Sequence, residues 1–214
     1  MFILHRAKNF FWKELYKAGE FLSYQLGLPF ISGVSNRRDF WNDQAESLHA
    51  RWGEGDWDFR ILSQIIQRYQ VQSVLDVGCG SGRLFPLYEQ RGVRKVLGVD
   101  ISERALGIAN RRFPGVSTLC LAIDKESLPA GSWDLAISNR VLQHIPEAKI
   151  DLVIDKLCAS CNLVYVNELS ESDREHELFF MRFYDFGKLF HMRGYKMLEQ
   201  GVLDKQTYRL FGRR

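Results

Sequence analysis

The stretch VLDVGCGSGRL, residues 74–84, decides the fold of this 214-residue chain. An apolar run ends at Asp76 and Val77, and glycines then follow at every second position, at Gly78, Gly80 and Gly82. Glycines in such an arrangement let the backbone turn tightly and approach a ligand before a helix begins. The stretch therefore predicts a strand, a glycine-rich turn and a helix. A turn of this kind can also be purely structural, so the surrounding sequence has to distinguish the two.

From Val71 onward, short apolar runs alternate with helical segments, which is typical of βαβ units and a parallel sheet. Helices are expected from Ser102 to Arg112 and from Pro146 to about Ala159. An aromatic helical stretch follows later, at 178–194. Five runs are apolar nearly throughout and are expected to be buried strands: 71–78, 95–100, 116–122, 133–139 and 161–169. Two terminal runs, 195–203 and 205–212, suit an antiparallel edge pair.

Helical periodicity marks the residues that precede this region. Apolar residues recur at helical spacing over 8–26, and further helices are expected near 39–51 and 57–69. We therefore divide the chain into a helical N-terminal extension, residues 1–70, which would act as a lid or substrate cover, and an α/β core, residues 71–214.

Composition excludes several classes of protein. Hydrophobic residues make up 46% and the net charge is only +3, which argues against a disordered chain and against a dedicated nucleic-acid binder. Four cysteines are too few for a disulfide framework, so a reducing cytoplasm is the expected location. Cys158 and Cys161 form one C-x-x-C pair without a second pair to complete a zinc site, so no metal is expected. Lys and Glu interrupt the N-terminal apolar residues before a signal or membrane span is reached.

Two further acids follow the next two predicted strands. Asp100 ends the run VLGVD, where a carboxylate can accept hydrogen bonds from both ribose hydroxyls of an adenosine. Asp124, in AIDKESLP, could accept from an adenine amino group. A nicotinamide-dependent dehydrogenase is the rival interpretation. Its fingerprint is G-x-G-x-x-G, whereas this chain has G-x-G-x-G, and neither Asp76 nor Asp124 has a role in it.

Four segments in order, DVGCGSG, VDIS, AIDKESLP and WDLAISNRVLQHIP, resemble the class I S-adenosylmethionine-dependent methyltransferases. The resemblance covers residues 71 to about 170. It implies a Rossmann-like, mostly parallel seven-stranded sheet with an antiparallel terminal hairpin. It also implies S-adenosyl-L-methionine as cofactor. The implied binding residues are Asp76, Gly78 and Gly80 for the methionine part, Asp100 and Ile101 at the ribose, Asp124 at the adenine, and Asn139 and Arg140 beside the methyl group.

The sulfonium of this donor makes its methyl group electrophilic, so catalysis needs chiefly an aligned acceptor, with a base if the acceptor must lose a proton. His144, in VLQHIP, is the leading candidate base because it follows the donor-facing strand. The alternative is that His144 only packs or caps locally. Weaker candidates lie in or after the fifth strand, at Glu168, His176 and Asp185.

The acceptor is predicted less specifically. The fourth strand is followed by SNRV instead of an N-P-P-Y motif, and no Pro-Cys pair is present, so this pattern argues against a nucleic-acid substrate. We expect methyl transfer to oxygen or nitrogen of a small molecule, such as a glycoside or natural product. The alternative is a methyltransferase-like module that binds the donor or a protein partner without turnover. Basic and aromatic residues within 8–26 also permit peripheral membrane contact.

Overall fold

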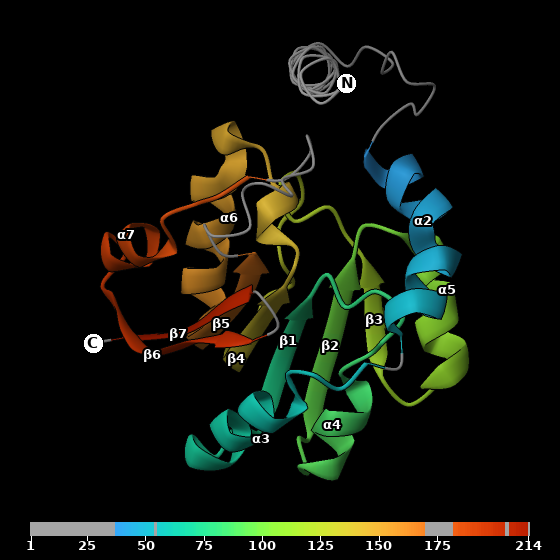
Figure 1. Ribbon diagram of the computed structural model, residues 1–214, viewed down its shortest axis with the longest axis horizontal. Helices are drawn as coiled ribbons and strands as arrows, with labels where there is room; N and C mark the ends of the chain where they lie inside the picture. The colour runs from blue at the N-terminus through green and yellow to red at the C-terminus, as the bar shows by residue number, and fades with distance from the viewer. Residues whose placement is uncertain (1–36, 54, 170–181, 204–205, 214) are drawn as a thin grey trace, which may run out of the picture.

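The computed structural model describes residues 37–53, 55–169, 182–203 and 206–213. Its centre is a seven-stranded sheet in the order β3-β2-β1-β4-β5-β7-β6 (Figure 1). The first five strands are parallel, and β7 runs antiparallel to both β5 and β6. This confirms the predicted Rossmann-like fold with its terminal hairpin. The strands are β1 Ser73–Val77, β2 Lys95–Asp100, β3 Ser117–Cys120, β4 Trp133–Asn139, β5 Cys161–Leu169, β6 Tyr195–Leu203 and β7 Gln206–Arg213.

Helices cover both faces of the sheet. One face packs against α3 (Phe59–Arg68), α4 (Phe85–Gln90) and α5 (Glu103–Arg112). The other face packs against α6 (Glu147–Ser160) and α7 (Phe186–His191). A short 3-10 turn, η1 (Leu142–His144), follows β4.

The central strands are apolar on successive residues because both of their faces are buried. In β4, Ala136 belongs to the core under α6 and the next residue, Ile137, belongs to the core under α3. Their register partners in β5, Val164 and Tyr165, divide between the two cores in the same way. The two layers of helices thus hold the carboxyl ends of β1, β2 and β4 at one edge.

Two sequence expectations about elements need correction. The third strand is not buried: β3 is only four residues long, lies at the edge of the sheet, and alternates between exposed and half-buried positions. The aromatic stretch is only partly helical, since residues 182–185 form no helix and α7 begins at Phe186. Asp185 stops the helix from extending backwards, because its side chain accepts a hydrogen bond from Lys188 N at 2.9 Å and caps α7.

Helix α2 (Arg37–Trp52) lies alongside α5 (Figure 1) and is polar on most of its surface, with Ala45 as its buried residue. The helix predicted at 8–26 lies outside the described residues, so the lid role assigned to residues 1–70 and the membrane contact through 8–26 stay predictions. Within the described part of the chain, no helix combines the length and apolar character needed to cross a membrane.

Candidate active site

The glycine-rich turn between β1 and α4 has the backbone conformation that the sequence predicts. Gly78, Gly80 and Gly82 have φ values of +71°, +54° and +77°, a region that other residues rarely adopt. A Cβ on Gly78 would lie 2.1 Å from Val141 Cγ2, so this glycine is required by packing. A Cβ on Gly80 would meet nothing within 4 Å, so this glycine borders open space. The turn therefore leaves room for a ligand at Gly80.

Asp100 ties the end of β2 to this turn. One carboxylate oxygen accepts from Gly80 N at 2.9 Å and the other from Ser102 N at 2.8 Å. Burial raises the pKa of Asp100, and the backbone donors oppose that rise. A carboxylate has about four lone-pair positions, so two such bonds leave acceptor capacity for a ribose diol. The next residue, Ile101, contributes its carbonyl oxygen to a contact with Cys120 Sγ at 3.5 Å.

Asp76 has a structural partner. Its carboxylate is buried and accepts a hydrogen bond from the Tyr88 hydroxyl, on α4, at 2.9 Å. Burial raises the pKa of Asp76 to about 7, although the Tyr88 bond opposes the shift. This contact holds α4 against β1 behind the glycine-rich turn, and contact of Asp76 with a ligand stays a prediction.

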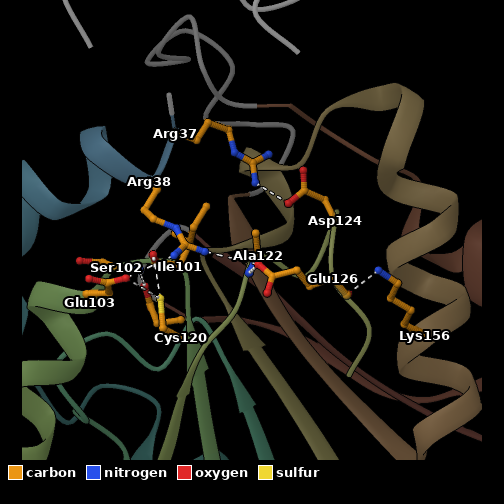
Figure 2. Close-up of polar contacts among 11 residues, drawn as sticks. Arg37, Arg38, Ile101, Ser102, Glu103, Cys120, Ala122, Asp124, Glu126 and Lys156 are labelled. Atoms are coloured by element: carbon orange, nitrogen blue, oxygen red, sulfur yellow. Dashed lines mark hydrogen bonds and ion pairs between the residues drawn. The ribbon is translucent and has the colours of Figure 1, made fainter. Parts of the chain in front are cut away.

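Asp124 lies in the segment after β3, where it is paired with α2. Its carboxylate accepts from Arg37 Nη2 at 2.8 Å, and its side chain has no solvent exposure (Figure 2). Arg37 also donates to the His144 carbonyl oxygen at 3.4 Å. The acid predicted to bind adenine is therefore covered by the start of α2.

Two further contacts hold this segment in place (Figure 2). Glu126 accepts from Ala122 N at 2.9 Å, which closes the turn around Asp124. Lys156, on α6, donates to the Ile123 and Glu126 carbonyl oxygens, both at 2.7 Å. The backbone around Asp124 is thus anchored on one side by α6, while Arg37 approaches its side chain from α2.

Asn139, at the end of β4, is half-buried and belongs to a polar cluster around a buried carboxylate. Its amide donates to Asp58, which is fully buried and lies just before α3. Asp58 in turn accepts from both Arg83 terminal nitrogens, at 2.6 and 3.0 Å. The Arg83 guanidinium lies over the Trp57 ring, 4.2 Å from its centroid. The orientation of the Asn139 amide is therefore set by a carboxylate from outside the sheet.

Arg140 has an unusual backbone at the same edge. Its φ is +59°, which costs a side chain with a Cβ roughly 1–2 kcal/mol. Its N–H donates to Asn167 O at 2.8 Å, and its guanidinium lies 5.4 Å from the Trp52 ring and 5.9 Å from the Trp57 ring. The strained turn leads from β4 into η1 and places a cation near two indoles, whose centroids are 5.7 Å apart.

His144 is the last residue of η1 and is half-buried. Its Nε2 lies 3.2 Å from Gln143 Nε2, and its ring packs edge-on against Trp41 of α2, with centroids 4.9 Å apart. These contacts fix the ring against α2, the helix that begins at Arg37. They fit both a packing role and a proton-accepting role, so the assignment of His144 as base stays a prediction.

Two of the weaker base candidates have structural contacts. Glu168 is buried and accepts from Val141 N at 3.1 Å and Leu142 N at 2.9 Å, so it caps η1. Burial raises its pKa to about 8 against the effect of those donors. Asp185 caps α7, and His176 lies outside the described residues.

Sequence reasoning missed Arg37, Asp58 and Arg83. Arg83 is part of the glycine-rich stretch itself, but its partner Asp58 lies 25 positions earlier. Arg37 and Asp124 are 87 positions apart. Residues this far apart in the sequence form no repeating pattern from which their contact could be predicted. The only hint was the presence of charged residues beside a motif and at helix starts.

No group of three or more His, Cys, Asp or Glu side chains that could hold a metal ion occurs among the residues that the structure describes. The C-x-x-C cysteines are both buried and free. Burial raises the pKa of Cys158 to about 11 and that of Cys161 to about 12, so these thiols are unreactive near neutral pH.

Comparison with known proteins supports the same region. Residues 74–162 match a family described as a methyltransferase domain. Over 121 residues the chain is 33% identical to the ubiquinone biosynthesis O-methyltransferase of Bordetella avium (strain 197N), covering 49% of this chain and 50% of that protein. Over 134 residues it is 32% identical to the tRNA U34 carboxymethyltransferase of Alcanivorax borkumensis, covering 59% of this chain and 41% of that protein.

The fold is similar to that of a solved structure, the magnesium protoporphyrin IX methyltransferase from Synechocystis PCC 6803 with bound SAH. The TM-score is 0.69 at 16% identity, covering 83% of this chain and 98% of that one. Residues 74–162 thus match a methyltransferase domain, and the fold is that of a solved methyltransferase; both findings agree with the resemblance to the class I S-adenosylmethionine-dependent methyltransferases. The chain spans about half the length of the curated relatives it matches.

Proposed function

We propose that this chain transfers the methyl group of S-adenosylmethionine to an oxygen or nitrogen atom of a small molecule, such as a glycoside or other natural product. The proposal rests on the hydrogen bond that Gly80 N donates to the Asp100 carboxylate, at 2.9 Å, and on the open space beside Gly80. A carboxylate with spare acceptor capacity next to a glycine-rich turn suits an adenosine with its ribose hydroxyls.

Different residues of the chain would bind the donor, line the acceptor side and accept a proton. Asp100 and the glycine-rich turn would hold the nucleoside and methionine parts, and Asp124 would accept from the adenine amino group. The donor supplies a methyl carbon that the sulfonium has already made electrophilic. Asn139 and Arg140 would line the acceptor side, and His144 would hold a proton released by the acceptor, if the acceptor carries one.

The acceptor class is supported by the names of two similar proteins. The Bordetella relative is named as an O-methyltransferase of ubiquinone biosynthesis and the Synechocystis protein as a methyltransferase of magnesium protoporphyrin IX. Both names describe small-molecule acceptors, in line with the SNRV sequence after β4. The Alcanivorax relative is named for a tRNA, so the shared domain alone does not select the acceptor.

Two measurements on the full chain test the proposal. Calorimetric titration with S-adenosylmethionine and S-adenosylhomocysteine should show binding of both. A coupled assay for released S-adenosylhomocysteine should then respond to one or more members of a panel of phenols, aromatic carboxylic acids, amines and glycosides, and not to bulk tRNA.

Each other outcome has a distinct meaning. The absence of donor binding would refute the proposal. Donor binding without release of S-adenosylhomocysteine with any acceptor would favour the alternative, a methyltransferase-like module that acts through a protein partner. Release with tRNA alone would replace the small-molecule acceptor by a nucleic acid.

A further inference from the structure

Ser102 connects the proposed ribose-binding acid to helix α2. The backbone N–H of Ser102 donates to Asp100 Oδ1 at 2.8 Å, and the Ser102 hydroxyl donates to Asn42 Oδ1, on α2, at 2.9 Å. Ser102 is 1% exposed and Asn42 is half-buried. Helix α2 lies alongside α5, which begins directly after Ser102 (Figure 1). Two hydrogen bonds thus link a helix outside the sheet to the carboxylate that the proposed function assigns to the ribose.

The neighbouring donors decide the direction of these hydrogen bonds. Asn42 Oδ1 also accepts from Arg104 N at 3.2 Å, and a backbone N–H can only donate, so the oxygen of the Asn42 amide must face α5. The Ser102 hydroxyl, which contacts the same oxygen, must then give its hydrogen to it. Its lone pairs stay available for Ala105 N, from which Ser102 Oγ accepts at 3.1 Å. Each group in this set therefore has one defined role.

Asn42 and Ser102 together cap the first turn of α5. The N–H groups of a first helical turn have no partner within the helix. Ser102 Oγ satisfies Ala105 N and Asn42 Oδ1 satisfies Arg104 N, so the cap is shared between two segments that are 60 positions apart. Ser102 has the extended backbone of a cap residue, with φ −92° and ψ 110°. Holding Ser102 in this conformation also fixes the direction of its N–H toward Asp100.

Asn42 differs from its polar neighbours on α2. Arg38 pairs with Glu103 at 3.4 Å and Asp43 pairs with Arg104 at 3.2 Å, and both pairs are exposed. Exposed pairs contribute little to stability. Asn42 instead accepts from a buried hydroxyl, which would lose the partner of its hydrogen if the amide were removed. A substitution at Asn42 should therefore disturb the cap of α5, whereas a substitution at Asp43 should not.

We propose that Asn42 is a positioning residue for the ribose of the donor, because it acts through Ser102 to hold the Asp100 carboxylate in the orientation that accepts the ribose hydroxyls. This inference rests on the proposed function. Asp100 has a second tether, since Gly80 N donates to its other oxygen at 2.9 Å. Loosening the Ser102 tether should therefore reduce the affinity for the ribose without abolishing it. Helix α2 would then take part in donor binding as well as in covering the acceptor.

The test is a calorimetric titration of the full-length chain with S-adenosylhomocysteine and with its 2′-deoxy analogue, which lacks one ribose hydroxyl. The wild type should prefer S-adenosylhomocysteine by about tenfold. In Asn42→Ala the affinity for S-adenosylhomocysteine should fall by about three- to tenfold and that for the analogue should fall less, so the preference should shrink. Asn42→Asp keeps an oxygen at the same position and should retain the preference of the wild type.

Asp43→Asn is the matched control. It weakens an exposed contact between α2 and α5 at the adjacent position and leaves Ser102 untouched, so both affinities should stay within about twofold of the wild type. An effect as large as that of Asn42→Ala would show that any loosening of α2 lowers donor affinity, and would contradict a specific role for Asn42.

A double substitution tests the route through Asp100. Asn42→Ala combined with Asp100→Ala should bind S-adenosylhomocysteine no more weakly than Asp100→Ala alone, because the carboxylate that Asn42 positions is already absent. Losses that add up in the double variant would mean that Asn42 affects the donor by another route, and the inference would be wrong.

The outcomes separate this inference from the proposed function. If the wild type binds neither ligand, both fail. If it binds both ligands equally well, or if Asn42→Ala lowers both affinities by the same factor or changes neither, the inference is wrong while the donor site stands. Thermal unfolding checks that each variant is folded. Asn42→Gln, which keeps the amide but moves its oxygen by one methylene group, replaces Asn42→Ala if that variant is not folded, and it should show the same reduced preference.

Discussion

Asp58 and Arg83 form a two-point ion pair, with oxygen–nitrogen distances of 2.6 and 3.0 Å, in contact with Asn139 at the end of β4. Asp58 is fully buried and the Arg83 side chain is only 13% exposed. Two planar groups that meet in this way restrict each other's orientation. The pair therefore joins the segment before α3 to the glycine-rich turn and fixes the Asn139 amide between them.

Asp58→Asn should destabilise the chain strongly, by about 3–5 kcal/mol, because it leaves the Arg83 guanidinium without its counter-charge in a buried place. Urea unfolding measures the loss. Asp43→Asn is a matched control: Asp43 pairs with Arg104 at 3.2 Å, but both side chains are more than 60% exposed. Its loss should be below about 1 kcal/mol. Equal effects of the two substitutions would contradict the role assigned to the buried pair.

Asp100→Ala should weaken binding of S-adenosylmethionine by about ten- to a hundredfold, since it removes charge-assisted hydrogen bonds to the ribose. Calorimetry on folded protein measures this. Asp134 serves as the control because it lies at the start of β4, away from the carboxyl ends, where it accepts from Ser73 N and Gln72 N, both at 2.9 Å. Unchanged affinity in Asp100→Ala, or an equal loss in Asp134→Ala, would remove Asp100 from the donor site.

Alanine at Gly78 and at Gly80 should have different effects, although both glycines have positive φ. Gly80→Ala should cost about 1 kcal/mol of stability from backbone strain alone and should weaken donor binding, because its methyl group enters open space beside the turn. Gly78→Ala adds a clash with Val141 and should cost clearly more. Thermal unfolding and donor titration of both variants check this, and equal stability losses would contradict it.

His144→Ala should lower turnover by about a hundred- to ten-thousandfold at nearly constant donor affinity, if His144 accepts the proton of the acceptor. The pH–rate profile should also lose its acidic limb. His191, which is exposed on α7, provides the matched control, and His191→Ala should retain full turnover. A loss below about tenfold with an unchanged profile would place His144 among the packing residues, and catalysis would then rest on alignment of the acceptor.

Stability should fall as the pH rises from about 5 to 8. The folded-state pKa of Glu168, about 8, lies above its ordinary value of 4.5, so the folded chain keeps a proton that the unfolded chain releases in this window. Asp76, with a pKa of about 7, acts in the same direction. Glu168→Gln should therefore lose stability less steeply between pH 5.5 and 8.5 in urea unfolding. A slope as steep as in the wild type would show that Glu168 is ionised in the folded chain.

Prediction from the sequence succeeded for strands whose position can be recognised from their own residues alone. The strands at 95–100, 133–139, 161–169 and 195–203 occur at the predicted positions, because each is an apolar or alternating run with clear ends. The third strand was predicted as buried, although its edge position exposes it. Whether a strand lies at the edge or in the centre of a sheet depends on the order of the strands. The residues of a single strand do not specify that order.

At the candidate site, too, contacts between strand ends could be predicted and contacts between distant segments could not. Asp100 and Gly80 could be predicted as neighbours because the ends of adjacent parallel strands meet at one edge of a sheet. The Arg37–Asp124 and Asp58–Arg83 pairs could not, since each joins a helix start to a distant loop. Such pairs depend on where α2 and α3 dock, and that docking is decided by tertiary packing.

The position of β7 has a consequence for synthesis of the chain. Strand β7 lies between β5 and β6 in the sheet although it follows both in the sequence. Until residues 206–213 have left the ribosome, the backbone N–H and C=O groups on one side of β5 have no strand to pair with, and β6 has none at all. A nascent chain that stalls before this point exposes the unpaired edge of β5, and a strand of another chain can pair with that edge. The hairpin therefore makes completion of the sheet a late event, and chaperone contact is most useful during that interval.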